Sequence, residues 1–192
     1  MLAIGELIPV CVGFSLLAVL VISSVTDLAW HRIPNILLLS ALVLALALQA
    51  SGEGIDGIVS ATAGLLVGLA FLMPLYAMGG MGAGDVKLLG VVGAFLGPWG
   101  ALVAGVAALI AGAVLGIAYI AWRSMRPVLA YQAWKLMQWQ YGGNTQAPAP
   151  MSLVTPIRGS GFAYAPAIAA GAVFSMWQLG MLAQLAIIDV TL

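Results

Sequence analysis

The chain has 192 residues, of which 64% are apolar and only 6% are charged. About a quarter of the residues in a soluble domain are charged, so this composition excludes a soluble globular protein. Six basic and six acidic side chains cancel to a net charge of zero, which excludes a nucleic-acid-binding protein, and the single cysteine excludes a disulfide scaffold. The mean hydropathy of +1.15 indicates a polytopic membrane protein.

Uncharged apolar stretches recur along the whole chain. A transmembrane helix needs roughly 17–25 mostly apolar residues. The stretch 88–122 is longer than one span, and the sequence Gly97-Pro98-Trp99-Gly100 within it predicts a turn between two spans. We therefore predict an all-α transmembrane bundle of six spans in a single integral domain, with the fourth span starting near Met81. The stretches that carry the six spans are 7–26, 33–52, 57–84, 88–122 and 159–188.

All basic residues fall on one side of this topology. Arg32 lies between the first two spans and Lys87 at the start of the fourth, and the others lie between the fifth and the sixth: Arg123, Arg126, Lys135 and Arg158. Because basic residues are retained in the cytoplasm, we expect both termini on the outer side, N-out and C-out. The segment 123–158 is then the main cytoplasmic loop, with an interfacial helix over 127–141 and a linker over 142–150.

Two acidic residues lie on the cytoplasmic side of this topology. Asp27 ends the first span and Asp85 begins the fourth. An acid at the end of a span is a functional hypothesis by default, although helix capping or an interfacial position explains either residue alone. If the two spans pack together, the carboxylates share a partly dehydrated cleft and hold one proton between them. Such a pair can activate water for hydrolysis of a peptide bond, with no metal or cofactor.

Two motifs surround these aspartates. One is an aspartate followed by a basic residue and Ile-Pro-Asn, and the other is G-x-G-D-x-K. The first comprises Asp27, Arg32, Ile33, Pro34 and Asn35, and the second Gly82, Gly84, Asp85 and Lys87. A weaker third element opens the last span at Tyr164 and Pro166. This pattern resembles the type IV prepilin peptidase family, the membrane aspartic proteases with a G-x-G-D motif.

The resemblance implies an aspartic endopeptidase of the bacterial cytoplasmic (inner) membrane, with Asp27 and Asp85 as its catalytic residues. The implied partner is a prepilin or pseudopilin precursor, whose basic leader is cleaved after a Gly at the cytoplasmic face. Larger members of the family also methylate the new N-terminus and carry paired C-x-x-C zinc motifs. This chain, with one cysteine, resembles the short Tad/Flp-pilus type, so neither a metal site nor N-methyltransferase activity is expected.

The neighbouring motif residues are expected to bind substrate or support the site. The two glycines of G-x-G-D lack a Cβ and would let an extended substrate approach closely. Lys87 and Arg32 have an alternative role as topology anchors, and Asn35 as a helix cap. The set comprises Gly82, Gly84, Lys87, Arg32, Pro34, Asn35, Tyr164 and Pro166.

Three other classes of protein compete with this interpretation. A small proton- or ion-coupled transporter also uses paired acids, but it places them near the midplane of the membrane. A structural subunit would leave the two motifs as coincidences. A presenilin-like protease shares G-x-G-D but has its first aspartate in a different sequence context. The sequence leaves open the oligomeric state, the particular precursor and which aspartate holds the proton.

Overall fold

A computed structural model describes residues 4–30, 32–140 and 164–182 of the chain. Its helices are α1 (Ile4–Trp30), α2 (Asn35–Glu53), α3 (Ile55–Ala77), α4 (Ala83–Gln140) and α5 (Ala165–Gln178). The described ranges contain helices and connecting turns but no strand, which confirms the all-α prediction. Arg158 and the predicted linker 142–150 lie outside the described residues.

The chain divides into two compact units. One comprises Met1–Gly112 together with Ala163–Leu192, and the other comprises Ala113–Phe162. In the second unit, the predicted loop is helical as far as Gln140, where α4 ends. The rings of Tyr131 and Trp134 contact each other in a tilted arrangement, with centroids 6.0 Å apart. The prediction of a single integral domain is not tested by this division.

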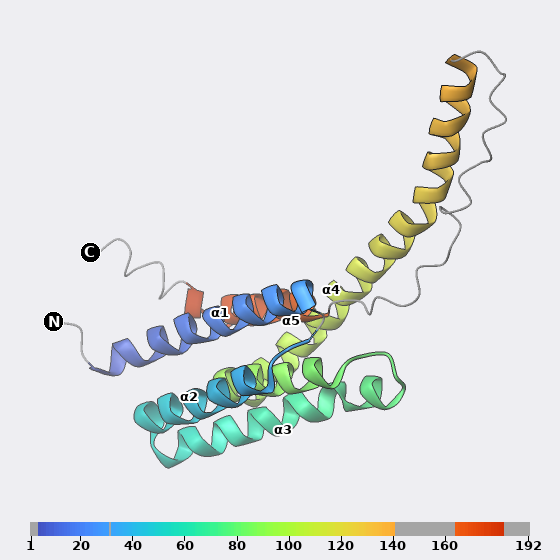
Figure 1. Ribbon diagram of the computed structural model, residues 1–192. Helices are drawn as coiled ribbons and strands as arrows, with labels where there is room; N and C mark the ends of the chain where they lie inside the picture. The colour runs from blue at the N-terminus through green and yellow to red at the C-terminus, as the bar shows by residue number, and fades with distance from the viewer. Residues whose placement is uncertain (1–3, 31, 141–163, 183–192) are drawn as a thin grey trace, which may run out of the picture. The chain divides into compact units, whose positions relative to one another are not determined.

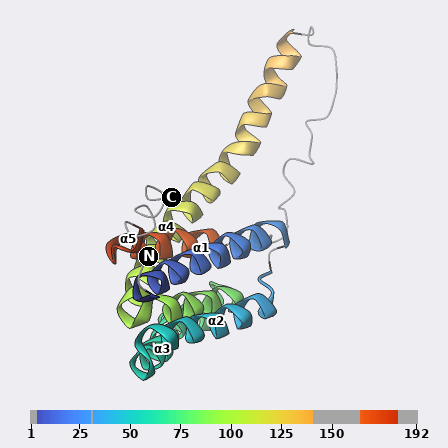
Figure 2. The same cartoon turned by 90° about the vertical axis from the view of Figure 1, so that its left-hand side faces the viewer.

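In the first unit, α1 packs against both α2 and α5, and α2 packs against α3. Figures 1 and 2 show α1 and α5 side by side, with α2 and α3 forming an adjacent pair. Helices α3 and α4 approach closely because glycines face each other: a Cβ added to Gly64 would meet the backbone carbonyl of Gly93. Small residues are the usual means by which helices in a membrane come into backbone contact.

Helix α4 is interrupted at Gly97. The φ of 73° and ψ of −179° at this residue lie outside the helical region, and a positive φ favours glycine. Side chains bond the carbonyls around the break: Gln49 Nε2 donates to the Phe95 carbonyl at 2.9 Å, and Ser175 Oγ to the Gly100 carbonyl at 3.0 Å. The break falls on the first residue of the predicted turn.

The predicted number of six spans is not confirmed. Among the described residues, four helical segments are long and apolar enough to cross a bilayer: Ile8–Trp30, Asn35–Glu53, Ile55–Ala77 and Ala83–Trp122. The predicted fourth and fifth spans both lie in α4, on either side of its break at Gly97, and are counted there as one segment. The predicted sixth span is described only in part: α5 has 14 residues, and residues 159–163 and 183–188 lie outside the described residues. The N-out, C-out orientation stays a prediction.

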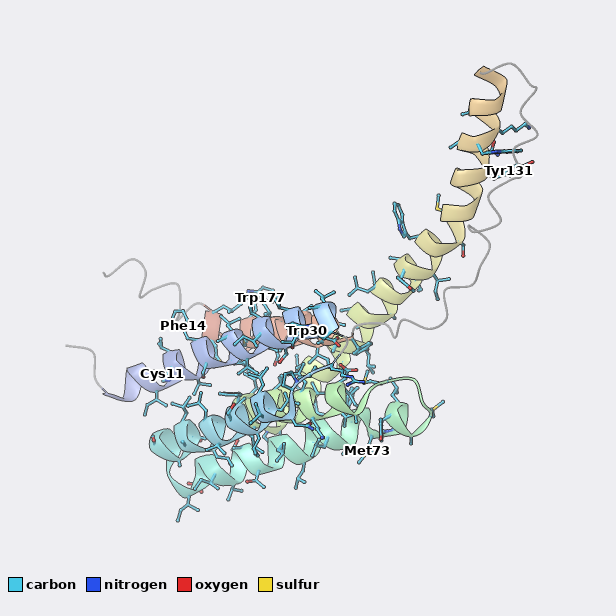
Figure 3. All side chains as sticks on the ribbon, viewed as in Figure 1. Cys11, Phe14, Trp30, Met73, Tyr131 and Trp177 are labelled. Carbon is cyan, nitrogen blue, oxygen red and sulfur yellow. The ribbon has the colours of Figure 1, made fainter. Side chains whose placement is uncertain are left out.

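Apolar side chains cover much of the surface of the first unit. Phe14, Trp30, Met73 and Trp177, labelled in Figure 3, are all exposed. Conversely, four polar or charged side chains are buried among the described residues: Ser23, Asp27, Asp85 and Ser175. An apolar surface over a few buried polar groups suits a lipid environment and directs attention to those groups. Together with the apolar helices, this arrangement is that of a membrane protein.

Candidate active site

Asp27 lies near the end of α1 and is only 7% exposed. Its Oδ2 accepts a hydrogen bond of 3.1 Å from the backbone N–H of Ala165, the first residue of α5. The first N–H groups of a helix have no partner within the helix, and the helix dipole makes that end favourable for a carboxylate. Thus α5 holds one oxygen of Asp27 by its N-terminus.

Asp85 lies in the first turn of α4 and is 8% exposed. Its Oδ2 accepts a hydrogen bond of 3.3 Å from the backbone N–H of Gly82, just before the helix. This bond is one half of a capping box, since a side chain in the first turn reaches back to the residue that caps the helix. The chain reverses into this position through Gly79, whose φ is 74°.

The two carboxylates occupy one site. Asp27 is the charged side chain that acts electrostatically on Asp85, so the two groups lie within short range. The connection between α1 and α2 contributes as well, because a Cβ on Gly84 would contact Ile33 at 3.5 Å. The structure therefore brings together the two aspartates that the sequence singled out, from helices separated along the chain. Burial removes the water that would otherwise screen their repulsion.

Lys87 and Asn35 interact with each other, on the exposed surface. Lys87 Nζ donates a hydrogen bond of 3.0 Å to Asn35 Oδ1, which links α4 to α2. The cap of α2 is Pro34, and its carbonyl accepts the N–H groups of Leu37 and Leu38. The Asn35 side chain thus joins two helices and does not cap its own, so the capping role suggested by the sequence is wrong.

The third sequence element lies at the start of α5. The Tyr164 hydroxyl donates to the Ala108 carbonyl at 3.1 Å, and its ring occupies the space beside Gly112, where an added Cβ would collide with it. Asp85 also acts electrostatically on Tyr164, which places this residue near the pair. Pro166 is the second residue of α5, where the missing N–H costs no helical bond. These contacts fix the helix end that holds Asp27.

The other motif residues are more exposed. Arg32, Pro34 and Gly82 are exposed and Gly84 is partly buried. An alanine at Gly84 would make an ordinary contact with Ile33, so nearby protein atoms do not require glycine at this position. His31 lies outside the described residues. A Cβ added to Gly82 would lie 3.2 Å from Oδ2 of Asp85, so this glycine lies directly beside the carboxylate. The approach of a substrate backbone at the two glycines stays a prediction.

Two features near Asp27 were missed by the sequence analysis. The first is the backbone N–H of Ala165, which is brought to Asp27 by tertiary packing alone. No sequence pattern predicts this hydrogen bond. The second is Ser23, which is fully buried and whose Oγ has no hydrogen-bond partner in the described part of the chain. Its spacing to Asp27, one helical turn earlier, was a signal that could have been used.

The donor set in this region consists of carboxylates. Among the described residues, no group of three or more His, Cys, Asp or Glu side chains is arranged to hold a metal ion. Cys11 is exposed on α1. The arrangement offers two carboxylates for proton transfer, each held by one backbone N–H group.

The fold and site define a helical membrane protein with a buried pair of aspartates at one end of its helices. Residues 14–117, more than half of the chain, match the type IV leader peptidase family. The chain belongs to this family and is a peptidase at that level. The matched stretch contains both Asp27 and Asp85 and ends before Tyr164. No curated protein and no solved structure matches the chain.

Proposed function

We propose that this protein is an aspartic endopeptidase that removes the basic leader of type IV prepilin-like precursors, cutting after a Gly at the cytoplasmic face of the membrane. One observation carries the proposal: Asp27 and Asp85 are both buried, come from different helices and lie within range for Asp27 to act electrostatically on Asp85. Membership of the type IV leader peptidase family supports the same class of reaction.

The proposed mechanism is acid–base catalysis by the two carboxylates. Two close, buried carboxylates cannot both ionise easily, so the pair carries one proton. The ionised member takes a proton from a water molecule, and the resulting hydroxide attacks the scissile carbonyl carbon. The protonated member donates its proton to the carbonyl oxygen. Collapse of the tetrahedral intermediate breaks the C–N bond, and the departing amine takes up the proton that the first carboxylate removed from water. A carboxylate and a new amino terminus result.

The backbone donors have a defined part in this mechanism. Ala165 N–H and Gly82 N–H each bind Oδ2 of one aspartate, which fixes the carboxylates while Oδ1 of each is left for water and substrate. Orientation of this kind is a large source of rate enhancement, because the reacting groups need no further ordering. The mechanism uses neither a metal nor a cofactor, and we expect chelators to leave it unaffected.

The finer assignment rests on the sequence motifs. We propose a Tad/Flp-type enzyme of the bacterial inner membrane, without N-methyltransferase activity, acting on a pilin or pseudopilin precursor. Such a precursor carries an apolar helix just after the scissile bond, so the bond would lie at the membrane boundary. The alternative, a proton- or ion-coupled transporter, has less support. Asp27 is near the end of α1 and Asp85 is in the first turn of α4, away from the middle of either helix.

Co-expression with a Flp-type prepilin tests the proposal. The mobility of the precursor is compared for the wild type, Asp27→Asn and Asp85→Asn, at equal abundance in the membrane. Asp56→Asn is the matched control, since Asp56 is also an aspartate in the first turn of a helix but is exposed. We expect processing by the wild type and the control only. Processing by either of the other two variants would overturn the proposal.

A further inference from the structure

Ser23 is a fully buried hydroxyl side chain of α1, and it differs from Ser15 and Thr26 of the same helix. It is 0% exposed, and its Oγ has no hydrogen-bond partner in the described structure. In the same helix, Ser15 and Thr26 donate to carbonyls of the preceding turn, as serine and threonine commonly do within helices. The other fully buried serine, Ser175, donates to the Gly100 carbonyl at 3.0 Å. Ser23 is therefore a buried hydroxyl that lacks the usual bond.

Ser23 lies on the same face of α1 as Asp27. The two residues are at i and i+4, and side chains at these positions are neighbours, with about 5–6 Å between their Cβ atoms. Side chains of an α-helix lean toward its N-terminus, so the Asp27 carboxylate extends over the turn that holds Ser23. Leu20 and Leu16, both buried, continue this face further along the helix. The hydroxyl thus lies next to the candidate site, one turn deeper in the bundle.

An unpartnered hydroxyl in this position is unfavourable unless something bonds to it. Buried polar groups in native proteins are paired with protein or with ordered water. Asp27 itself does not bond to Ser23, although its Oδ2 is bound by Ala165. A water molecule between the hydroxyl and Oδ1 of Asp27 would satisfy both groups, and the spacing of one helical turn suits a bridge of this length.

We propose that Ser23 is a positioning residue that binds the water molecule which the aspartate pair activates. The inference rests on the proposed peptidase function. The water donates one hydrogen to the Asp27 carboxylate and the other to Ser23 Oγ, which leaves a lone pair of its oxygen free to attack the scissile carbonyl. Ser23 itself touches neither the substrate nor the transferred proton.

Ser23→Ala separates this role from a purely structural one. Alanine removes the hydroxyl without leaving a polar group unpaired, so a structural role predicts unchanged or higher thermal stability and unchanged activity. The positioning role predicts a kcat that is roughly 10–100-fold lower, with KM changed less than about threefold. Ser23→Thr, which keeps the hydroxyl, should restore most of the rate. Full activity of Ser23→Ala, or a loss that Ser23→Thr does not restore, would overturn the proposal.

Ser175→Ala is the matched control for burial. It also removes a fully buried hydroxyl, but one that is already bonded to Gly100 and lies away from Asp27 along the bundle. This variant should have lower thermal stability and a kcat within about twofold of the wild type. A loss of kcat equal to that of Ser23→Ala would show that the effect is one of general packing, and would overturn the proposal.

A measurement without substrate keeps this inference separate from the proposed function. Infrared spectra of the purified protein with ¹³C-labelled aspartate identify the Asp27 carboxylate band by its loss in Asp27→Asn. Removal of a bridging water changes the hydrogen bonding of that carboxylate, so the band should shift in Ser23→Ala and stay in place in Ser175→Ala. An identical band in the wild type, Ser23→Ala and Ser175→Ala would overturn the water bridge, whether or not any precursor is cleaved.

Discussion

Two acidic pairs lie in the described structure, and their surroundings are opposite. Glu53 and Asp56 flank the turn between α2 and α3 and are exposed, whereas Asp27 and Asp85 are buried. Asp56 and Asp85 each occupy the first turn of a helix, where the dipole favours a negative charge. The favourable position at the start of a helix therefore applies to Asp56 and Asp85 alike. The two pairs differ in packing, since Asp27 and Asp85 are buried whereas Glu53 and Asp56 are exposed to water that screens their charges.

The largest difference between the buried and the exposed pair is expected when one aspartate of each is lengthened by one methylene group. Asp85→Glu keeps the charge but moves the carboxylate by about 1 Å or more relative to Asp27. We expect the rate of precursor processing to fall by roughly 100-fold, because acid–base catalysis depends on position. Asp56→Glu should process at the wild-type rate. The comparison fails if the two variants have equal rates in a time course with purified enzyme.

The next largest effect is expected from a substitution at the close contact between α3 and α4. Gly64→Ala would drive a Cβ into the Gly93 carbonyl, so we expect a loss of about 1–3 kcal/mol in stability from overpacking. Gly116 in α4 has open space around it, and Gly116→Ala should be neutral or more stable by up to about 1 kcal/mol. Thermal unfolding in detergent measures both variants. A destabilised Gly116→Ala beside an unchanged Gly64→Ala would contradict the packing described here.

A smaller effect is expected when the start of α5, which binds Asp27, is held less firmly. Tyr164→Phe loses the hydrogen bond to the Ala108 carbonyl but keeps the ring beside Gly112. We expect a loss of about 1 kcal/mol in stability and a reduction of about fivefold in kcat, because the Ala165 N–H is less firmly held on Asp27. Steady-state kinetics on a prepilin peptide measures the second effect. An unchanged kcat would show that α5 stays in place without this bond.

The smallest effect is expected at the exposed bond between Lys87 and Asn35. Lys87→Gln keeps a donor and removes the charge, and exposed polar pairs contribute about 0–1 kcal/mol. Processing should stay within about threefold of the wild type, and Asn35→Ala should behave alike. A loss as large as that of Asp85→Glu would give Lys87 a direct part in the reaction and would widen the site beyond the aspartate pair.

The sequence was most informative where local pattern decides the structure. Apolar stretches and the Gly97-Pro98 dipeptide predicted the helices and the break in α4, and the charge pattern selected Asp27 and Asp85. The number of six spans was not confirmed, because the fourth and fifth predicted spans both lie in α4 and part of the stretch 159–188 lies outside the described residues. The bond from Ala165 to Asp27 was beyond prediction, since it joins residues far apart in the chain through tertiary packing alone.

The partner of Lys87 was also beyond local pattern. Lys87 was expected to bind substrate, support the site or anchor the topology. It lies two residues after Asp85, and helical positions two apart point to different faces. The structure accordingly directs Lys87 to Asn35 on α2. Motif spacing alone therefore does not predict which side chains interact, because the helical period sets the direction in which each one points.

The central claim, that Asp27 and Asp85 act as one catalytic unit, is tested most directly by the processing rates of Asp27→Asn, Asp85→Asn and the double variant on one purified prepilin. Residues that act together are not additive, so the account predicts that the double variant has the same residual rate as either single variant. Asp56→Asn, combined with either single variant, should lower the rate no further. A double variant whose loss equals the product of the two single losses would contradict the account, because the two carboxylates would then act independently.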